Sequence, residues 1–190
     1  MAKSGEAMKT LLEVKDVQKY FPIRGGLLFK EIGRVHAVSN VNLEIGEGET
    51  VGLVGESGCG KSTLGRVIAG LYRQSAGSIH FKGKDISFLN SQEAKTMRQE
   101  IQVIFQDPYE SLNPRHSIGY ILEEPFVIHK IGTPAERGKW VDELLARVGL
   151  SPDAKNKFPH EFSGGQRQRI GIARAISLKP KLIVCDEPVS

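Results

Sequence analysis

The chain has 190 residues, of which 39% are hydrophobic and 25% are charged, and its formal net charge is +4 at neutral pH. This size and balance fit one globular domain with its own core. The sequence has no apolar run of the roughly 20 residues that a bilayer-spanning helix needs, and no basic block typical of binding to a nucleic acid or to an anionic membrane surface. No secretion segment follows Met1–Glu6, so we expect a cytoplasmic protein in which Cys59 and Cys185 stay reduced.

The front of the chain predicts antiparallel β structure. Residues 11–20 are typical of a half-buried strand, and the prolines and glycines of residues 22–34 predict a loop or a hairpin insertion. Residues 35–45 alternate between apolar and polar side chains, as in a strand with one wet face. Residues 77–86 form another alternating segment, with a turn at Lys82–Lys84.

The most specific pattern is Gly55-Glu56-Ser57-Gly58-Cys59-Gly60-Lys61-Ser62, which fits the phosphate-binding loop G-x-x-x-x-G-K-[ST]. It lies between a predicted strand at residues 50–54 and a predicted helix at residues 63–71. Its glycines let backbone N–H groups converge, and the helix adds its N-terminal donors. Lys61 supplies a charge for the β- and γ-phosphates, and the Ser62 hydroxyl can bind Mg²⁺. The alternative is a glycine-rich turn with an incidental Lys-Ser pair, which the flanking strand and helix disfavour.

The second half of the chain predicts two parallel strands and two helices. Apolar runs at residues 101–105 and 181–185 are typical of central strands covered on both faces. Thr133–Glu136 forms a capping box, and a helix with buried positions at helical spacing runs from it to Gly149. A second helix is expected to start at Ser163–Gln166 and to turn Ile170, Ala173 and Ile176 inward. These last three residues define its predicted core face.

Asp186 and Glu187 end the second of these strands. Ligands of open α/β sheets lie beyond the carboxyl ends of the strands, which predicts that this pair faces the phosphate loop. Asp186 can hold Mg²⁺ through a water molecule, and Glu187 can accept a proton from an attacking water or orient it. The alternative for such a pair is a turn or a helix cap.

Ser163-Gly164-Gly165-Gln166 predicts a second anion-binding helix N-terminus. One nucleotide does not need two such sites on one chain, so we expect two copies to meet and each to complete the other's site. The alternative is a simple helix cap with a glycine turn. The histidines at positions 80, 116, 129 and 160 lack metal-ligand spacing and are expected to be surface or packing residues.

These motifs resemble the ATPase subunits of ABC transporters. Residues 54–62, 105–115 and 159–169 further resemble the oligopeptide and dipeptide importer ATPase subunits of bacteria, and the resemblance runs from Leu11 to Ser190. It implies an α/β fold, a P-loop NTPase of ABC type with a parallel core sheet, an N-terminal antiparallel β subdomain and a helical subdomain. It also implies a single domain over residues 1–190. Within it, residues 11–50 and 76–90 would be the antiparallel part, residues 50–75, 98–107 and 180–190 the P-loop core, and residues 108–165 the helical subdomain.

The resemblance also implies roles for particular residues. Tyr20 would stack on adenine, the alternative being a tyrosine at a strand edge, and Gln106 would sense Mg²⁺ and the γ-phosphate, the alternative being a strand-end cap. Glu187 would be the general base, and Lys61 would assist catalysis. The phosphate and Mg²⁺ ligands would be Gly55, Glu56, Ser57, Gly58, Cys59, Gly60, Lys61, Ser62 and Thr63, with Ser62, Gln106 and Asp186 at the metal. Ser163, Gly164, Gly165 and Gln166 would touch the γ-phosphate bound by a partner subunit.

By the same resemblance, the protein binds and hydrolyses ATP to power the import of oligopeptides or dipeptides. Its partners would be transmembrane permease subunits, docked near residues 108–130, and a second ATPase subunit, identical or a sister. It would bind no nucleic acid and would lie peripherally on the cytoplasmic face of the cell membrane. Two alternatives are a soluble ABC-type ATPase that does not serve transport and a non-catalytic nucleotide-binding module.

The chain departs from the family pattern in one respect. It stops at Ser190, and the family's later switch histidine has no counterpart. The strand that the family places between the phosphate-loop strand and the strand ending in Asp186 and Glu187 is also absent. We therefore expect a C-terminally shortened cassette that binds nucleotide weakly and hydrolyses it poorly.

Overall fold

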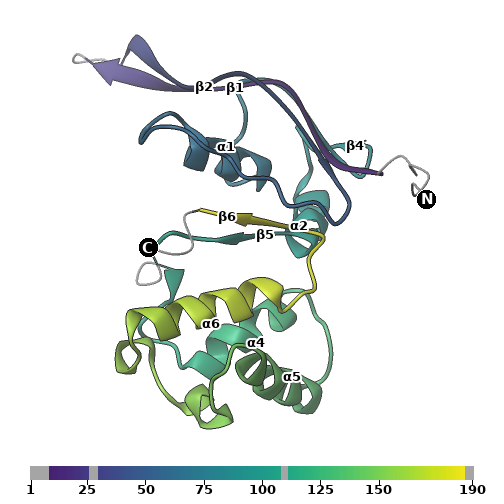
Figure 1. The fold of residues 1–190 in the computed structure, drawn as a ribbon, viewed down its shortest axis with the longest axis vertical. Coiled ribbons are helices and arrows are strands. Elements are labelled where there is room, and N and C mark those ends of the chain that lie inside the picture. The colour runs from purple at the N-terminus through teal and green to yellow at the C-terminus, as the bar shows by residue number, and fades with distance from the viewer. Residues whose placement is uncertain (1–8, 26–29, 108–110, 187–190) are drawn as a thin grey trace, which may run out of the picture. The chain divides into compact units, whose positions relative to one another are not determined.

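The structure, a computed structural model, describes residues 9–25, 30–107 and 111–186. The chain divides into two compact units, residues 1–94 and residues 95–190 (Figure 1). In the described residues, no helix combines the length and the apolar character that crossing a bilayer requires.

The first unit holds an antiparallel sheet of four strands in the order β2-β1-β3-β4. The strands are β1 (Thr10–Gly25), β2 (Lys30–Gly46), β3 (Ala76–Phe81) and β4 (Lys84–Asp85). The strands predicted at residues 11–20, 35–45 and 77–86 are confirmed, and residues 22–25 and 30–34 of the predicted loop or hairpin insertion continue β1 and β2. Leu12, Val14 and Val17 of β1 are buried with Ile79 of β3, so alternate residues of these strands form the core of this unit.

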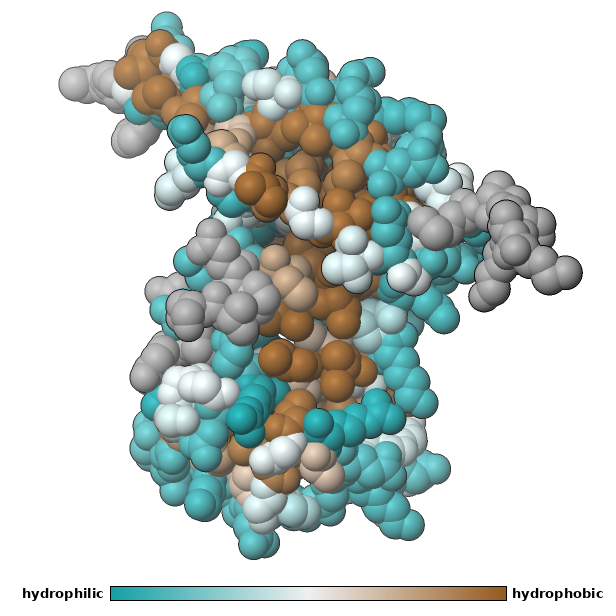
Figure 2. Space-filling view, in the orientation of Figure 1, coloured by the Kyte–Doolittle hydropathy of each residue, from teal (hydrophilic) through white to brown (hydrophobic). Residues whose placement is uncertain are grey.

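Beyond the wide part of the sheet, β1 and β2 continue as a two-stranded ribbon. β3 pairs with β1 only between Leu12 and Gln18, whereas β2 accompanies β1 to its end at Gly25. We call residues 21–25 and 30–35 the arm. Figure 2 shows hydrophobic surface on this ribbon at the upper left.

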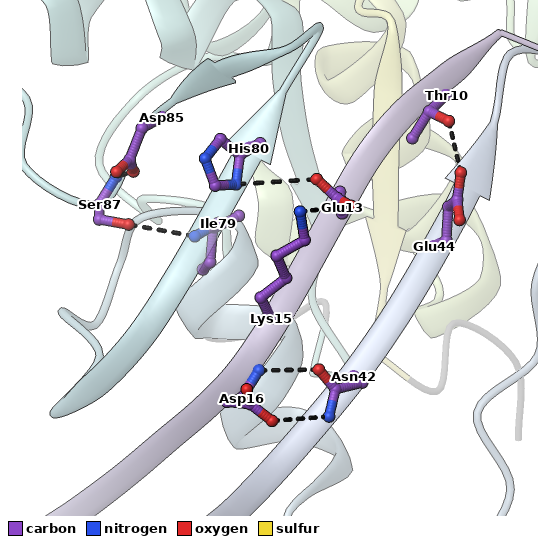
Figure 3. Close-up of polar contacts among 10 residues, drawn as sticks. All are labelled: Thr10, Glu13, Lys15, Asp16, Asn42, Glu44, Ile79, His80, Asp85 and Ser87. Carbon is purple, nitrogen blue, oxygen red and sulfur yellow. Dashed lines mark hydrogen bonds and ion pairs between the residues drawn. The ribbon is translucent and has the colours of Figure 1, made fainter.

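Side-chain contacts between strands help to set the register of the sheet (Figure 3). The backbone N–H of Asp16 donates to Asn42 Oδ1 at 2.9 Å, and Asn42 Nδ2 donates to Asp16 Oδ1 at 2.9 Å. Asp16 has a φ of 48° and lies where the pairing of β1 with both neighbours shifts. These two hydrogen bonds therefore stabilise a β-bulge at Asp16, a residue that the regular pairing of the strands leaves without a backbone partner. The buried Ser87 hydroxyl accepts the N–H of Ile79 at 3.1 Å.

Helix α1 (Lys61–Ile68) follows the phosphate loop and packs on β1 and β2. Leu64, Val67 and Ile68 are buried, so the helix turns one apolar face to the sheet. The helix predicted at residues 63–71 is thus confirmed, although it begins two residues earlier, at Lys61, and ends at Ile68.

The prediction of a strand at residues 50–54 is wrong. These residues carry no regular secondary structure, and Val54 is 97% exposed. A strand forms only where a neighbouring strand accepts and donates its backbone hydrogen bonds. Within the described residues, the strand order of neither sheet includes residues 50–54, so their backbone has no strand partner.

The second unit combines a parallel strand pair with helices. β5 (Ile101–Ile104) and β6 (Leu182–Cys185) pair in parallel, with Ile101 opposite Leu182 and Ile104 opposite Cys185. This confirms both predicted strands, but not their cover on both faces, since Ile183 is 37% exposed. The helices are α2 (Ser91–Glu100), which begins in the first unit, α4 (Ile118–Ile128), α5 (Pro134–Arg147) and α6 (Gly164–Ile176), with short 3₁₀ helices η1 (Pro152–Asn156) and η2 (Pro159–Glu161).

The core of the second unit lies between α4, α5 and α6. Leu122 of α4, Leu145 of α5 and Ile170 of α6 are completely buried in one cluster. The predicted capping box of α5 is confirmed, and the helix ends at Arg147, shortly before Gly149. The predicted inward residues of α6 are also confirmed, with Ile176 packed on the cluster from its edge.

Candidate functional site

The phosphate loop is held against β2 by Gly60. This residue has a φ of 99°, and a Cβ placed on it would lie 2.0 Å from the Ala37 carbonyl oxygen. Only glycine adopts this conformation at such a distance without displacing the backbone. Gly58 has a φ of 80°, and Cys59 N donates to Glu56 O at 3.3 Å, which closes the turn. The loop is therefore a compact bend pressed on β2.

Helix α1 begins without a side-chain cap. Its N-cap is Gly60, which offers no side-chain acceptor, and its first turn contains no acidic residue. In contrast, α4, α5 and α6 each begin with a hydroxyl that accepts a backbone N–H. The uncapped first turn of α1 presents N–H donors and the positive end of the helix dipole, which together favour an anion.

Lys61 points back over the loop. Its Nζ donates to the Gly55 and Glu56 carbonyl oxygens, each at 2.8 Å, and lies 3.8 Å from Cys59 Sγ. Ser62 and Thr63 follow it in the first turn and are half-buried. A glycine cradle, an uncapped helix start and an ammonium group fit a polyphosphate, so the predicted phosphate ligands form one local group.

Tyr20 lies on β1, with its ring engaged by other side chains. The Arg34 guanidinium lies 4.5 Å from the ring centroid, and the His36 ring centroid is 6.0 Å away. Tyr20 N also donates to Ser75 Oγ at 3.1 Å. Sequence analysis missed Arg34 at this position, because only the register of β1 and β2 brings the two residues together. The adenine role of Tyr20 stays a prediction.

Gln106 and Asp186 belong to one edge of the second unit. They follow β5 and β6, and the carboxyl ends of parallel neighbours meet at the same edge. Asp186 N donates to Ile104 O at 2.9 Å, which extends the pairing to this residue. Glu187 lies outside the described residues. Within the described ranges, no group of three or more His, Cys, Asp or Glu residues could hold a metal.

The Ser163–Gln166 segment begins α6 with a reciprocal cap. Ser163 Oγ accepts the N–H of Gln166 at 3.3 Å, and Gln166 Oε1 accepts the N–H of Ser163 at 2.9 Å. A Cβ on Gly164 or Gly165 would meet no atom within 4 Å, so packing does not require glycine at these two positions. The helix cap at Ser163 is therefore present, and the anion-binding role of Ser163–Gln166 stays a prediction.

Two features of the second unit were not foreseen. Arg174 Nη1 donates to the Ser111 carbonyl at 2.6 Å, and burial lowers the pKa of this guanidinium. The position of Arg174 on the inner side of α6 is the sequence signal from which this contact could have been predicted. A cavity of about 300 Å³ lies between α4, α5 and the end of α6, walled by Phe126 and Trp140.

Comparison with known proteins agrees with these features. The model of the family described as ABC transporter matches residues 38–190. The oligopeptide transport ATP-binding protein AppF of Bacillus subtilis is 56% identical over 96% of this chain and 56% of its own length. The oligopeptide transport ATP-binding protein OppF of Salmonella typhimurium is 48% identical over 97% of this chain and 56% of its own length. The chain thus spans about half the length of these curated relatives.

The fold is shared with solved cassettes. The dimeric ATP-binding cassette MJ0796, solved in a post-hydrolysis state with ADP and Pi, has a TM-score of 0.83 and 31% identity, and the match covers 94% of this chain and 75% of that one. The predicted α/β P-loop fold of ABC type, with its antiparallel β and helical subdomains, is confirmed. So is the resemblance to oligopeptide importer subunits. With this match over residues 38–190, the chain belongs to the ABC transporter family.

Proposed function

We propose that this protein binds and hydrolyses ATP to power the import of oligopeptides or dipeptides. The observation that carries the proposal is the cradle of Gly60 and Lys61 at the uncapped start of α1. The cargo follows from the names of the relatives, which are oligopeptide transport ATP-binding proteins.

At the phosphate loop, the N–H groups from Gly55 to Thr63 would hold the phosphate oxygens. Lys61 would exchange its contacts with the Gly55 and Glu56 carbonyls for the β- and γ-phosphates. Bound Mg-ATP supplies a γ-phosphoryl group whose transfer to water releases free energy. Ser62 would hold Mg²⁺ at this loop, Asp186 would hold it through a water molecule, and Gln106 would sense it.

The residues that follow β5 and β6 in the sequence would act on the water that attacks the γ-phosphate. Glu187 would accept the proton of the attacking water or orient that water, and Gln106 would sense Mg²⁺ and the γ-phosphate. Catalysis of this kind depends on positioning and charge neutralisation more than on covalent chemistry. The exposed Gln106 side chain at a strand end is consistent with this role.

A second ATPase subunit, identical or a sister, would complete each nucleotide site. Ser163, Gly164, Gly165 and Gln166 would meet the γ-phosphate bound by the partner subunit. The two glycines at the start of α6 support this role, since they place no side chain of their own beside its first N–H groups. The dimeric form of the solved relative also supports it.

Transmembrane permease subunits would dock on the helical part of the second unit. α4 leaves Tyr120, Val127 and Ile128 about half exposed, at 53%, 49% and 53%. Exposed apolar side chains on one helix favour a protein interface. Docking there, within the predicted region 108–130, would place the protein peripherally at the cytoplasmic face of the membrane.

Calorimetry of the intact protein with Mg-ATP tests the proposal. Lys61→Ala is expected to weaken binding roughly tenfold to a hundredfold, because it removes a charged hydrogen-bond donor. Lys139→Ala, an exposed lysine of α5, is the matched control and should leave binding unchanged. Absence of binding heat in the intact protein, or equal affinity in Lys61→Ala, would refute the nucleotide site.

Glu187→Gln separates a motor from the two alternatives. A motor that lost its general base should retain ATP and accumulate as a dimer. A non-catalytic binding module should show the same ATP retention and the same dimer fraction as the parent. Purification from membranes then identifies the partners. Recovery with transmembrane subunits is expected, and recovery without any would favour a soluble ABC-type ATPase.

A further inference from the structure

The side chain of Arg34, at the inner end of the arm, covers one face of the Tyr20 ring. Tyr20 lies opposite His36 in the register of β1 and β2, and Arg34 lies two residues farther out, opposite Pro22. Alternate residues of a strand share a face, so Arg34 and Tyr20 project from the same side of the ribbon. The Arg34 guanidinium lies over the ring, 4.5 Å from its centroid. A cation within about 6 Å of a ring centroid is attracted to the face of the ring.

Glu31 holds the guanidinium in this position. Arg34 Nε donates to Glu31 Oε1. The two residues are three apart in the sequence, which regular alternation would place on opposite faces of a strand. However, the pairing shifts between Ile23 and Arg24, which leaves Ile32 as the extra residue of β2. Beyond this bulge, Glu31 returns to the face of Arg34, where its carboxylate binds one edge of the guanidinium and leaves the flat side over the ring.

The backbone of Tyr20 is held separately from its ring. Tyr20 N donates to Ser75 Oγ at 3.1 Å, and this contact does not involve the side chain of the tyrosine. The His36 ring is tilted by 46° to the Tyr20 ring, with 6.0 Å between the centroids. Within the described residues, no cation other than Arg34 lies over the Tyr20 ring. The orientation of the ring therefore depends mainly on Arg34, and a base that stacks on this ring must use its other face.

The phosphate loop and Arg34 lie on opposite sides of His36 along β2. This strand has a bulge at Ala37, because the two neighbours of Ala37 pair with consecutive residues of β1. The loop meets β2 at the bulge, since a Cβ on Gly60 would lie 2.0 Å from the Ala37 carbonyl oxygen. A nucleotide whose phosphates lie on the loop would therefore reach the Tyr20 ring from the side away from Arg34.

We propose that Arg34 is a positioning residue of the nucleotide site, which holds one face of the Tyr20 ring so that the other face meets the adenine base. A ring that is held in place before the nucleotide arrives loses less conformational freedom on binding, which strengthens the stack. Arg34 itself does not contact the nucleotide. This inference rests on the proposed function and on the predicted adenine contact of Tyr20, and it adds the residue that sets the strength of that contact.

Calorimetry with two ligands tests this role, because only one of them carries a base. Arg34→Ala should weaken the binding of Mg-ATP to the intact protein about threefold to fivefold. The binding of Mg-tripolyphosphate, which has the phosphates but no adenine, should stay as in the parent. Arg34→Lys should restore part of the ATP affinity, since an ammonium group is also attracted to a ring face. Circular dichroism checks that each variant folds.

Arg73→Ala is the matched control. The Arg73 guanidinium lies over the Phe88 ring, also at 4.5 Å from the centroid, and Phe88 is 72% exposed. This variant removes the same kind of contact from a ring that has no place in the proposed nucleotide site, so it should bind both ligands like the parent. A double-mutant cycle adds a second control. In a Tyr20→Ala background, Arg34→Ala should have no further effect, because the ring through which Arg34 acts is gone.

Three results would overturn this inference alone. The first is equal ATP affinity of Arg34→Ala and the parent. The second is an equal loss of affinity for ATP and tripolyphosphate, which would indicate a general disturbance of the site. The third is a loss of ATP affinity that persists in the Tyr20→Ala background, which would indicate that Arg34 contacts the nucleotide directly. Absence of ATP binding by the parent would overturn the proposed function together with this inference, so the two failures are distinguishable.

Discussion

The contact between Gly60 and β2 can be tested with a single methyl group. In Gly60→Ala, the added Cβ would lie 2.0 Å from the Ala37 carbonyl oxygen and 3.7 Å from Val38 Cγ2. Real Cβ atoms essentially never approach another heavy atom closer than 3.0 Å. The loop or β2 must therefore move by about 1 Å, and the atom in the way is backbone that has no rotamer to change.

The cost of this substitution has two parts. A side chain at a φ of 99° is strained by about 1–2 kcal/mol, and overpacking against the backbone adds about 1–3 kcal/mol. Gly58→Ala is the matched control, because Gly58 has a φ of 80° and a Cβ there would meet no atom within 4 Å. It should cost only the first part, about 1–2 kcal/mol.

Urea unfolding and ATP titration of the intact protein measure both effects. Gly60→Ala should lower the free energy of unfolding by about 2–5 kcal/mol and weaken ATP binding more than Gly58→Ala does, because only the former displaces the loop from β2. If the two variants unfold at the same urea concentration and bind ATP equally, the loop does not depend on its contact with Ala37.

Three further predictions concern other residues. Mg-ATP should slow the alkylation of the exposed Cys59 and leave that of Cys185 unchanged, as peptide mass mapping after iodoacetamide treatment would show; equal protection of both would contradict this. Ser163→Ala should lower the free energy of unfolding by about 1 kcal/mol through the lost helix cap, and Ser163→Thr should restore most of it in the same urea assay. The N–H and the hydroxyl of Thr133 donate to Glu136 and hold the pKa of that carboxyl below its usual 4.5. This contribution to stability is present above pH 4.5 and is lost as the pH falls through the lowered pKa, so Glu136→Gln should remove that part of the acid sensitivity in thermal melts.

Local signals predicted the helix starts and the phosphate loop from sequence. Thr133 and Ser163 each lie three residues before a side chain that accepts the N–H of the cap residue. This pattern involves only neighbours in the sequence, so no distant partner is needed to predict it. The loop before Lys61 likewise depends on glycines and a helix start within a few residues. For this reason the position of α1 and most of the candidate phosphate ligands could be read from the sequence alone.

Features that depend on distant neighbours could not be predicted in this way. The apolar run at residues 50–54 has the composition of a strand, but strand pairing needs a partner that the described chain does not supply. The face of Ile32 depends on a bulge that only the register of β1 and β2 reveals. The contact of Arg34 with Tyr20 depends on the same register.

The hydrogen bonds of Lys61 to its own loop have a consequence for the speed of nucleotide capture. Because carbonyl oxygens already hold the ammonium group in place, the side chain has given up much of its rotational freedom before any phosphate arrives. Binding then requires an exchange of acceptors, with little reorganisation of the main chain. Association should accordingly be limited by diffusion and charge attraction, with single-step kinetics in stopped-flow measurements using a fluorescent ATP analogue.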